Sequence, residues 1–116
     1  MSSKIEIYAR IVSTAYHMLF LVMENESLGF CLTGNYEYTK ASCHDFHMLC
    51  AAISCAPHDY VGIADGLAKI INGYKEKVLP ELSELSEMSP DVEYYAQNVL
   101  HCMHRMHRYC LDQLSK

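Results

Sequence analysis

The stretch of greatest chemical interest is HCMHRMHRYC, which covers residues 101–110 near the end of the chain. Its three histidines recur at every third residue, and the imidazole ring is a common ligand of zinc, copper and iron. On a helix, neighbouring members of such a row lie about 60° apart, so adjacent pairs can share a metal. Arginines flank the row and would repel a cation. The row consists of His101, His104 and His107, and the arginines are Arg105 and Arg108.

A second histidine pair with the same spacing, His44 and His47, lies in the middle of the chain. Two helices of a bundle could bring this pair together with His101 and His104 to bind a transition metal. Metal sites in helical bundles usually include inward carboxylates, often as Glu-x-x-His, and the chain contains neither that motif nor HExxH. We therefore expect these histidines at the rim or surface, with no cofactor. A His/Cys metal-binding bundle remains the alternative.

The six cysteines fit no familiar framework, because no CxxC pair occurs among them. Most are expected to be small buried apolar side chains. Cys43 differs, because it lies beside an expected helix N-terminus, where the helix dipole favours a thiolate. Its neighbour His44 would point about 100° away on a helix, so the two cannot form a nucleophile–base pair. Gly-rich phosphate loops and GxSxG are also absent, and we expect a protein that is not an enzyme.

Arg10 and His17 are separated by six residues near the start of the chain. This spacing resembles the Arg…His motif of helical ribonucleases of the HEPN type. The resemblance implies RNA cleavage by these two residues. The family's usual polar residue next to the arginine is missing, because Ile11 follows Arg10. A HEPN-like ribonuclease is therefore the second alternative.

Caps and apolar periodicity predict four main helices. Ser3 and Glu6 form a capping box before a helix over residues 4–24. The next helices are expected at 43–55 and from residue 57 or 59 toward residue 78. Ser89-Pro90-Asp91 combines a cap, a proline at the first helical position and a first-turn acid, which predicts a last helix over 90–114.

The last helix carries an apolar seam, and the first helix carries two apolar stripes. The seam, with spacings of four and three residues, consists of Val92, Ala96, Val99, Met103, Met106 and Cys110. The second stripe of the first helix is Ile7, Ile11, Met18 and Leu21. These patterns predict an all-α, up-down four-helix bundle in a single domain over residues 1–116, with a fifth helix if 80–88 is helical. Because two apolar sides need neighbours on both, the first and last helices also suggest a homodimer.

The composition excludes some classes of protein. The chain has 116 residues and a formal net charge of −5, which argues against direct binding of nucleic acid. The longest apolar run, residues 18–23, is too short to span a bilayer. No signal peptide is apparent. We therefore expect a cytoplasmic protein without membrane contacts.

Two segments fall outside the predicted helical pattern. Residues 25–41 form a predicted long loop, and residues 76–93 are rich in acids. Loops held by a rigid scaffold often carry function, and acidic side chains suit a partner protein with a basic surface. The expected partner-binding residues are Tyr36, Glu37, Tyr38, Glu81, Glu84 and Glu87. The sequence thus favours a small regulatory or inhibitory protein that binds another protein. A phage or mobile-element inhibitor of host machinery is one kind of protein that fits this profile.

Overall fold

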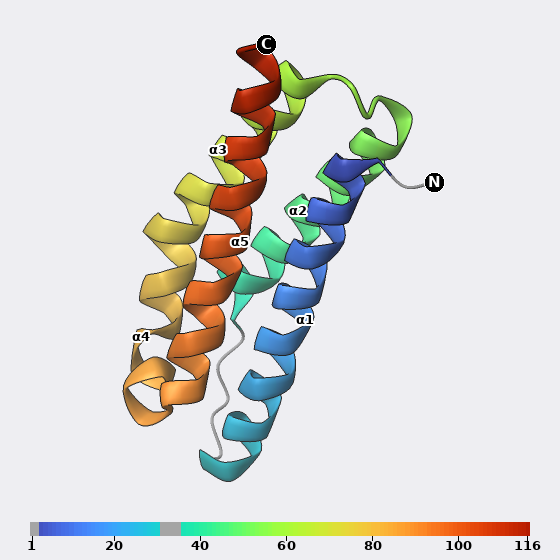
Figure 1. Cartoon of the computed structure of the whole chain (residues 1–116). Helices are drawn as coiled ribbons and strands as arrows, with labels where there is room; N and C mark the ends of the chain where they lie inside the picture. Colours follow the sequence, from blue (N-terminus) through green and yellow to red (C-terminus); the bar gives the residue numbers. More distant parts are fainter. Residues whose placement is uncertain (1–2, 31–35) are drawn as a thin grey trace.

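The computed structural model describes residues 3–30 and 36–116, without the side chains of 26–30. The described chain is an all-α helical bundle, as the sequence predicted (Figure 1). Its helices are α1 (Lys4–Phe30), α2 (Glu37–Cys55), α3 (Tyr60–Gly73), α4 (Leu79–Met88) and α5 (Pro90–Leu114). A π-helical turn, Tyr74–Val78, joins α3 directly to α4. The helices therefore form four rods, of which the third is α3 continued through α4.

The proline at position 80 explains why the third rod contains a π-helical turn. Proline has no N–H, and in a regular α-helix its ring clashes with the carbonyl four residues earlier. The N–H of Leu79 instead bonds to the carbonyl of Tyr74, five residues back. This wider turn carries the helix past Pro80 without a break. The predicted interruption at Pro80 is thus a change of helix type, and residues 80–88 are helical.

The predicted ends of α5 and the predicted start of α1 are confirmed. At α5, Ser89 Oγ accepts a hydrogen bond from the N–H of Val92, and Pro90 occupies the first turn. At α1, Ser3 and Glu6 bond reciprocally as a capping box. These signals lie within three residues of the helix ends that they stabilise, so the sequence alone displays them.

The predicted long loop over 25–41 is wrong over most of its length. Helix α1 continues to Phe30, and α2 begins at Glu37 rather than at residue 43. Residues 31–35 of the predicted loop lie outside the described residues. Asparagine, serine and glycine lower helix propensity by about 1 kcal/mol or less each, so they do not stop a helix that other contacts favour.

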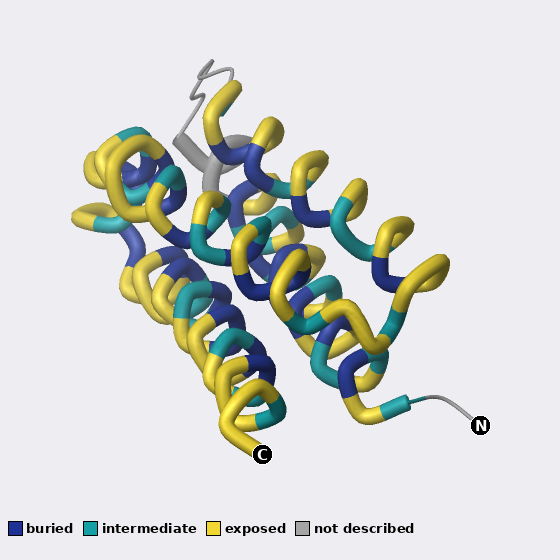
Figure 2. The backbone as a smooth tube through the Cα atoms, turned by 90° about the horizontal axis from the view of Figure 1, so that it is seen from above, coloured by how far each residue is buried: buried dark blue, intermediate teal, exposed yellow. Residues whose placement is uncertain are grey.

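Helix α5 packs against α1, α3 and α4, and α2 packs against α1 and α3. Figure 2, which looks along the bundle, shows buried positions on the inward sides and exposed positions outside. The whole predicted seam of α5 is buried. Because helices of the same chain cover this seam, it is not available for contact with a second copy.

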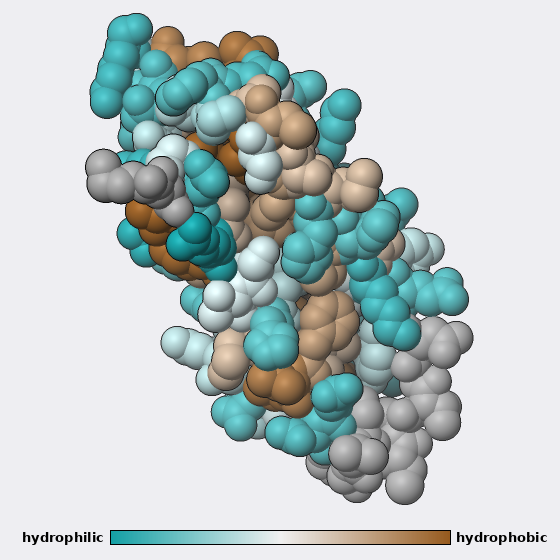
Figure 3. Space-filling model, turned by 90° about the vertical axis from the view of Figure 1, so that its right-hand side faces the viewer, coloured by the Kyte–Doolittle hydropathy of each residue, from teal (hydrophilic) through white to brown (hydrophobic). Residues whose placement is uncertain are grey.

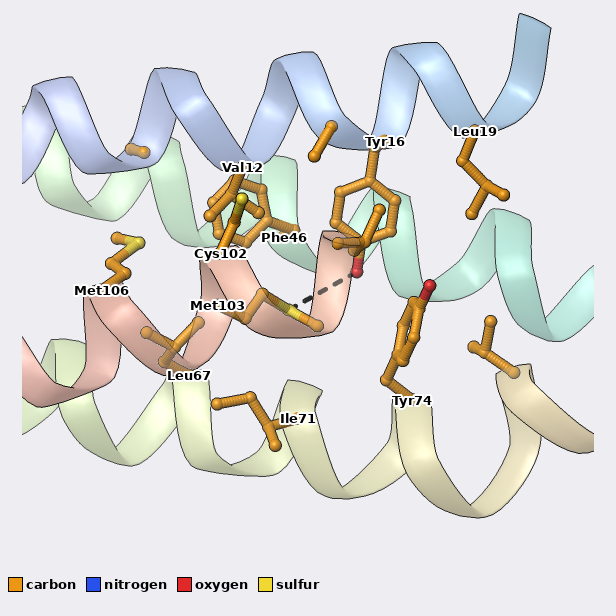
Figure 4. Packing of buried hydrophobic residues seen from close by; sticks show 14 of the residues in the cluster. Val12, Tyr16, Leu19, Phe46, Leu67, Ile71, Tyr74, Cys102, Met103 and Met106 are labelled. Carbon is orange, nitrogen blue, oxygen red and sulfur yellow. Dashed lines mark hydrogen bonds between the residues drawn. The ribbon is translucent and has the colours of Figure 1, made fainter. Parts of the chain in front are cut away.

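Polar groups within the core have hydrogen-bond partners. Tyr16 Oη lies 2.7 Å from Ser42 Oγ and donates to the sulfur of Met103 at 3.7 Å (Figure 4). Tyr74 Oη donates to the carbonyl of Ala96 at 2.6 Å. Burial raises the pKa of both phenols above the usual range, so they stay neutral donors. Pairing these hydroxyls avoids the cost of burying unsatisfied polar groups.

Candidate interaction surface

The N-terminus of α2 is capped from another helix. Tyr36, the residue before the first turn, gives no side-chain cap and has the left-handed backbone angles φ 47° and ψ 44°. The carboxylate of Glu81, on α4, takes over this role. It accepts bonds from the N–H of Tyr38 at 3.0 Å and from the N–H of Thr39 at 2.8 Å. These are the second and third amides of the helix, which a local cap would bond.

A third bond completes the contact between α2 and α4. The hydroxyl of Thr39, which is fully buried, donates to Glu81 Oε2 at 2.6 Å. A carboxylate at this point also interacts favourably with the positive end of the α2 dipole. The structure therefore brings together parts of the two segments that the sequence singled out, 25–41 and 76–93, through Tyr38, Thr39 and Glu81. We call the surface at this contact the α2–α4 surface and define it by Glu37, Tyr38, Lys77, Glu81 and Glu84.

Tyr38 is the most prominent side chain of the α2–α4 surface. It is 53% exposed, and the ammonium of Lys77 lies 5.5 Å from the centre of its ring. Glu37, the preceding residue, and Glu84, on α4, are exposed, whereas Tyr36 is half-buried and packs against the core. The surface thus offers an exposed aromatic ring with the ammonium of Lys77 over it, together with the exposed carboxylates of Glu37 and Glu84. Glu81 differs, because hydrogen bonds within the protein already occupy its carboxylate.

The three glutamates of α4 do not form a straight row. Each step of three residues rotates about 60° around a helix, so Glu81 and Glu87 lie about 120° apart. Glu81 faces the start of α2, Glu84 is exposed next to it, and Glu87 is exposed further around the helix. These three expected partner-binding residues therefore do not point in one direction. Of the two exposed carboxylates, that of Glu84 lies nearer to Glu81 around the helix.

The histidines are spread over the outside of the bundle. His44, His47, His101 and His104 are all exposed. Within residues 3–30 and 36–116 as described, no group of three or more His, Cys, Asp or Glu side chains is placed to hold a metal ion. Desolvation lowers the pKa of His104, and the nearby charge of Lys75 and of neighbouring cationic groups lowers it further. The two histidine pairs of the metal hypothesis are thus not brought together.

Cys43 is not at a helix N-terminus, because α2 begins six residues earlier. Partial burial raises the pKa of its thiol, with a smaller contribution from Cys50, which is the opposite of the predicted activation. Sequence reasoning missed a different contact: Cys43 Sγ lies 3.5 Å from Nδ1 of His47. A four-residue spacing on one helix is the signal that could have shown this pair. A raised pKa lowers the fraction of thiolate, which is the reactive form of cysteine.

Thiol reactivity gives a direct check of these environments. At pH 8 we expect a fast reaction of the exposed Cys55 with a thiol reagent and no fast reaction of Cys110, whose pKa burial raises to about 11. The thiolate is the reacting form, so a raised pKa and burial both slow the reaction. In time-resolved labelling, the variant Cys55→Ser should show one equivalent less of fast-reacting thiol than the unaltered protein. An equally fast reaction of Cys110, located by peptide mass spectrometry, would contradict the buried position of its side chain.

Arg10 and His17, the pair that resembles the HEPN motif, lie on the exposed side of α1. Six residues lie between them, and this step of seven positions places them two turns, or about 10 Å, apart along the helix axis. Arg10 contributes to lowering the pKa of the Glu6 carboxyl, after the larger effect of the hydrogen bonds from Ser3.

The outer side of α1 exposes large apolar side chains. Ile7, Ile11 and Leu21 are 47%, 44% and 42% exposed, and brown and teal side chains alternate on this side of the molecule (Figure 3). A groove of about 350 Å³ runs between α1 and α5 and is lined by Ile7, Arg10, Ile11, Thr14, Ala15, Met18, Asn98 and Cys102.

Among the described helices, the stretch Lys4–Asn25 is long and apolar enough to cross a membrane by length and composition, with a mean hydropathy of 1.2. This stretch is longer than the uninterrupted apolar run of residues 18–23, on which the sequence prediction of no membrane span was based. Core helices of soluble proteins pass the same test, and the inward face of α1 packs against α5 and α2. The length of α1 therefore does not decide where the protein resides.

No family model, no curated protein and no solved structure matches this chain.

Proposed function

We propose that this protein binds a partner protein through the α2–α4 surface and regulates or inhibits that partner without catalysis of its own. The observation that carries the proposal is the contact of Glu81 with Tyr38 and Thr39. It joins two segments whose contacting residues are 42 and 43 positions apart in the sequence. A surface that is fixed before binding loses less conformational entropy when a partner docks.

The chemistry of the surface favours a basic partner. Tyr38 offers a large ring with few rotatable bonds, and tyrosine is enriched in protein interfaces. The carboxylates of Glu37 and Glu84 are exposed on the same surface, in a chain whose formal net charge is −5. Exposed charges of this kind mainly increase the association rate and make it depend on salt. We therefore expect a partner that presents Lys or Arg side chains around an apolar patch.

The test compares capture by two variants that each truncate one exposed tyrosine and reverse one exposed acid, with the same change in net charge. The surface variant is Tyr38→Ala with Glu84→Lys, and the matched control is Tyr94→Ala with Asp112→Lys, at exposed positions of α5. Immobilised protein is incubated with lysate of the native host. We expect the unaltered protein and the control to capture the same protein species. The surface variant should capture at least about tenfold less of that species.

Salt and nuclease treatment complete the experiment. Capture should weaken as NaCl rises from low to high concentration, because exposed charges are screened. Equal capture by the surface variant and the control would refute the proposal. So would capture that disappears on nuclease treatment, since the bound species would then be attached through nucleic acid.

A further inference from the structure

The exposed side of α1 carries a second periodic pattern that the monomer does not use. Its positions are spaced by four, three, four, three and four residues and consist of Ile7, Ile11, Thr14, Met18, Leu21 and Asn25. At about 100° per residue they share one side of the helix, roughly opposite the buried face that contains Val12, Tyr16 and Leu19. Such spacing is typical of the seam of a coiled coil, which needs a facing helix.

We propose that a second copy of this chain docks on this seam, with the two α1 helices packed antiparallel about a two-fold axis. The seam contains two sets of positions, each repeating every seven residues. In an antiparallel pair, a position from one set faces a position from the other set of the partner. Alignment about the middle of the seam places Ile11 of one copy against Leu21 of the other, and Met18 against Thr14. Ile7 then faces Asn25 at both ends. Every seam position is matched when the same surface meets itself, as a two-fold contact requires.

The charges beside the seam favour this register. Arg10, His17 and Glu24 flank it on one side at intervals of seven residues, and all three are exposed. In the antiparallel register, Arg10 of each copy lies beside Glu24 of the other, and His17 lies beside its own symmetry mate. A parallel pair in register would instead place Arg10 beside Ala15 and His17 beside Val22. Opposite charges thus meet twice only in the antiparallel arrangement, which sets partner orientation.

The groove on the other side of the seam fits the same occupant. Small Ala15 faces its own mate there, next to the part of the groove formed by Asn98 and Cys102 of α5. The seam from Ile7 to Asn25 is about 28 Å long. A single helix pair of this length buries less than the roughly 800 Å² per partner of a standard stable interface. We therefore expect a weak dimer with a dissociation constant in the micromolar range.

The test is a charge-swap cycle measured by sedimentation equilibrium over about 5–500 µM of the full chain. We expect Arg10→Glu and Glu24→Arg each to weaken the dimer at least about tenfold, because each creates two like-charge contacts. The double variant should recover most of the lost affinity. The single reversal Asp112→Arg, on α5, serves as the matched control and should leave the dissociation constant unchanged.

A seam variant tests the apolar part of the interface. Ile11→Asp should abolish the dimer, while circular dichroism and urea unfolding confirm that the monomer stays folded. An unaltered protein that is monomeric at 500 µM overturns the proposal, as does a double charge swap weaker than either single variant. Binding of monomer to vesicles of phosphatidylcholine and phosphatidylglycerol, lost in Ile11→Asp, would overturn it and assign the seam to a lipid surface.

Discussion

Replacing Glu81 with alanine is expected to lower the free energy of unfolding by about 3 kcal/mol, because three hydrogen bonds to a charged group are lost and two of their donors belong to the buried Thr39. The carboxylate accepts from two amides and one hydroxyl at the start of α2. Thr39, which supplies two of these donors, is fully buried, so water cannot easily replace the lost acceptor. Urea unfolding followed by circular dichroism measures the change.

The neighbouring glutamate provides the control for this prediction. Glu84→Ala removes an equal charge from the same helix but no described hydrogen bond, and should change stability by less than about 0.5 kcal/mol. Glu81→Gln should fall between the two, since an amide oxygen can still accept but carries no charge. Equal stability of Glu81→Ala and Glu84→Ala would show that the Glu81 contact does not hold α2.

The same contact separates what the sequence could predict from what it could not. The bounds of α5 and the start of α1 follow from caps and periodicity that lie within a few residues of each other. The start of α2 depends on Glu81, which is 44 residues further along the chain than Glu37. No local sequence pattern shows this contact. The predicted helix therefore begins six residues too late, and a loop is predicted over the residues that form its first turns.

The continuation of the third rod past Pro80 has a similar explanation. Proline is a reliable sign that a regular α-helix cannot continue unchanged. It does not reveal whether the chain turns away or absorbs the proline in a π-helical turn. Burial of Val78, Leu82 and Leu85 on both sides of Pro80 favours the second outcome here, because a break would expose them. Packing of the whole bundle decides between two locally allowed structures.

The candidate site was predictable only as a pair of segments. Residues 36–38 and 81–87 lie in the two segments that fall outside the predicted helical pattern. The structure brings residues 36–38 next to Glu81. The individual roles required coordinates, since one glutamate is a structural cap and another is free. The contact between Cys43 and His47, four residues apart on one helix, could have been predicted from the sequence. The sequence prediction considers Cys43 only with the adjacent His44.

The second large effect concerns the seam of α5. Met103→Glu is expected to lower the free energy of unfolding by about 4 kcal/mol or more, because it places a charge in an apolar core without a partner. Met103 is fully buried and accepts a hydrogen bond from Tyr16. Domains of this size have a total stability of about 5–15 kcal/mol. The variant should therefore lie close to global unfolding at 37 °C.

Two substitutions on the same helix make this prediction specific. Leu111→Glu, at a position that is 46% exposed, should cost less than about 1 kcal/mol. Met103→Leu keeps the volume and should cost less than about 1.5 kcal/mol. Because the seam is covered within one chain, the loss in Met103→Glu should not depend on protein concentration. A loss that disappears at high concentration would show that this seam, rather than the outer side of α1, joins two copies.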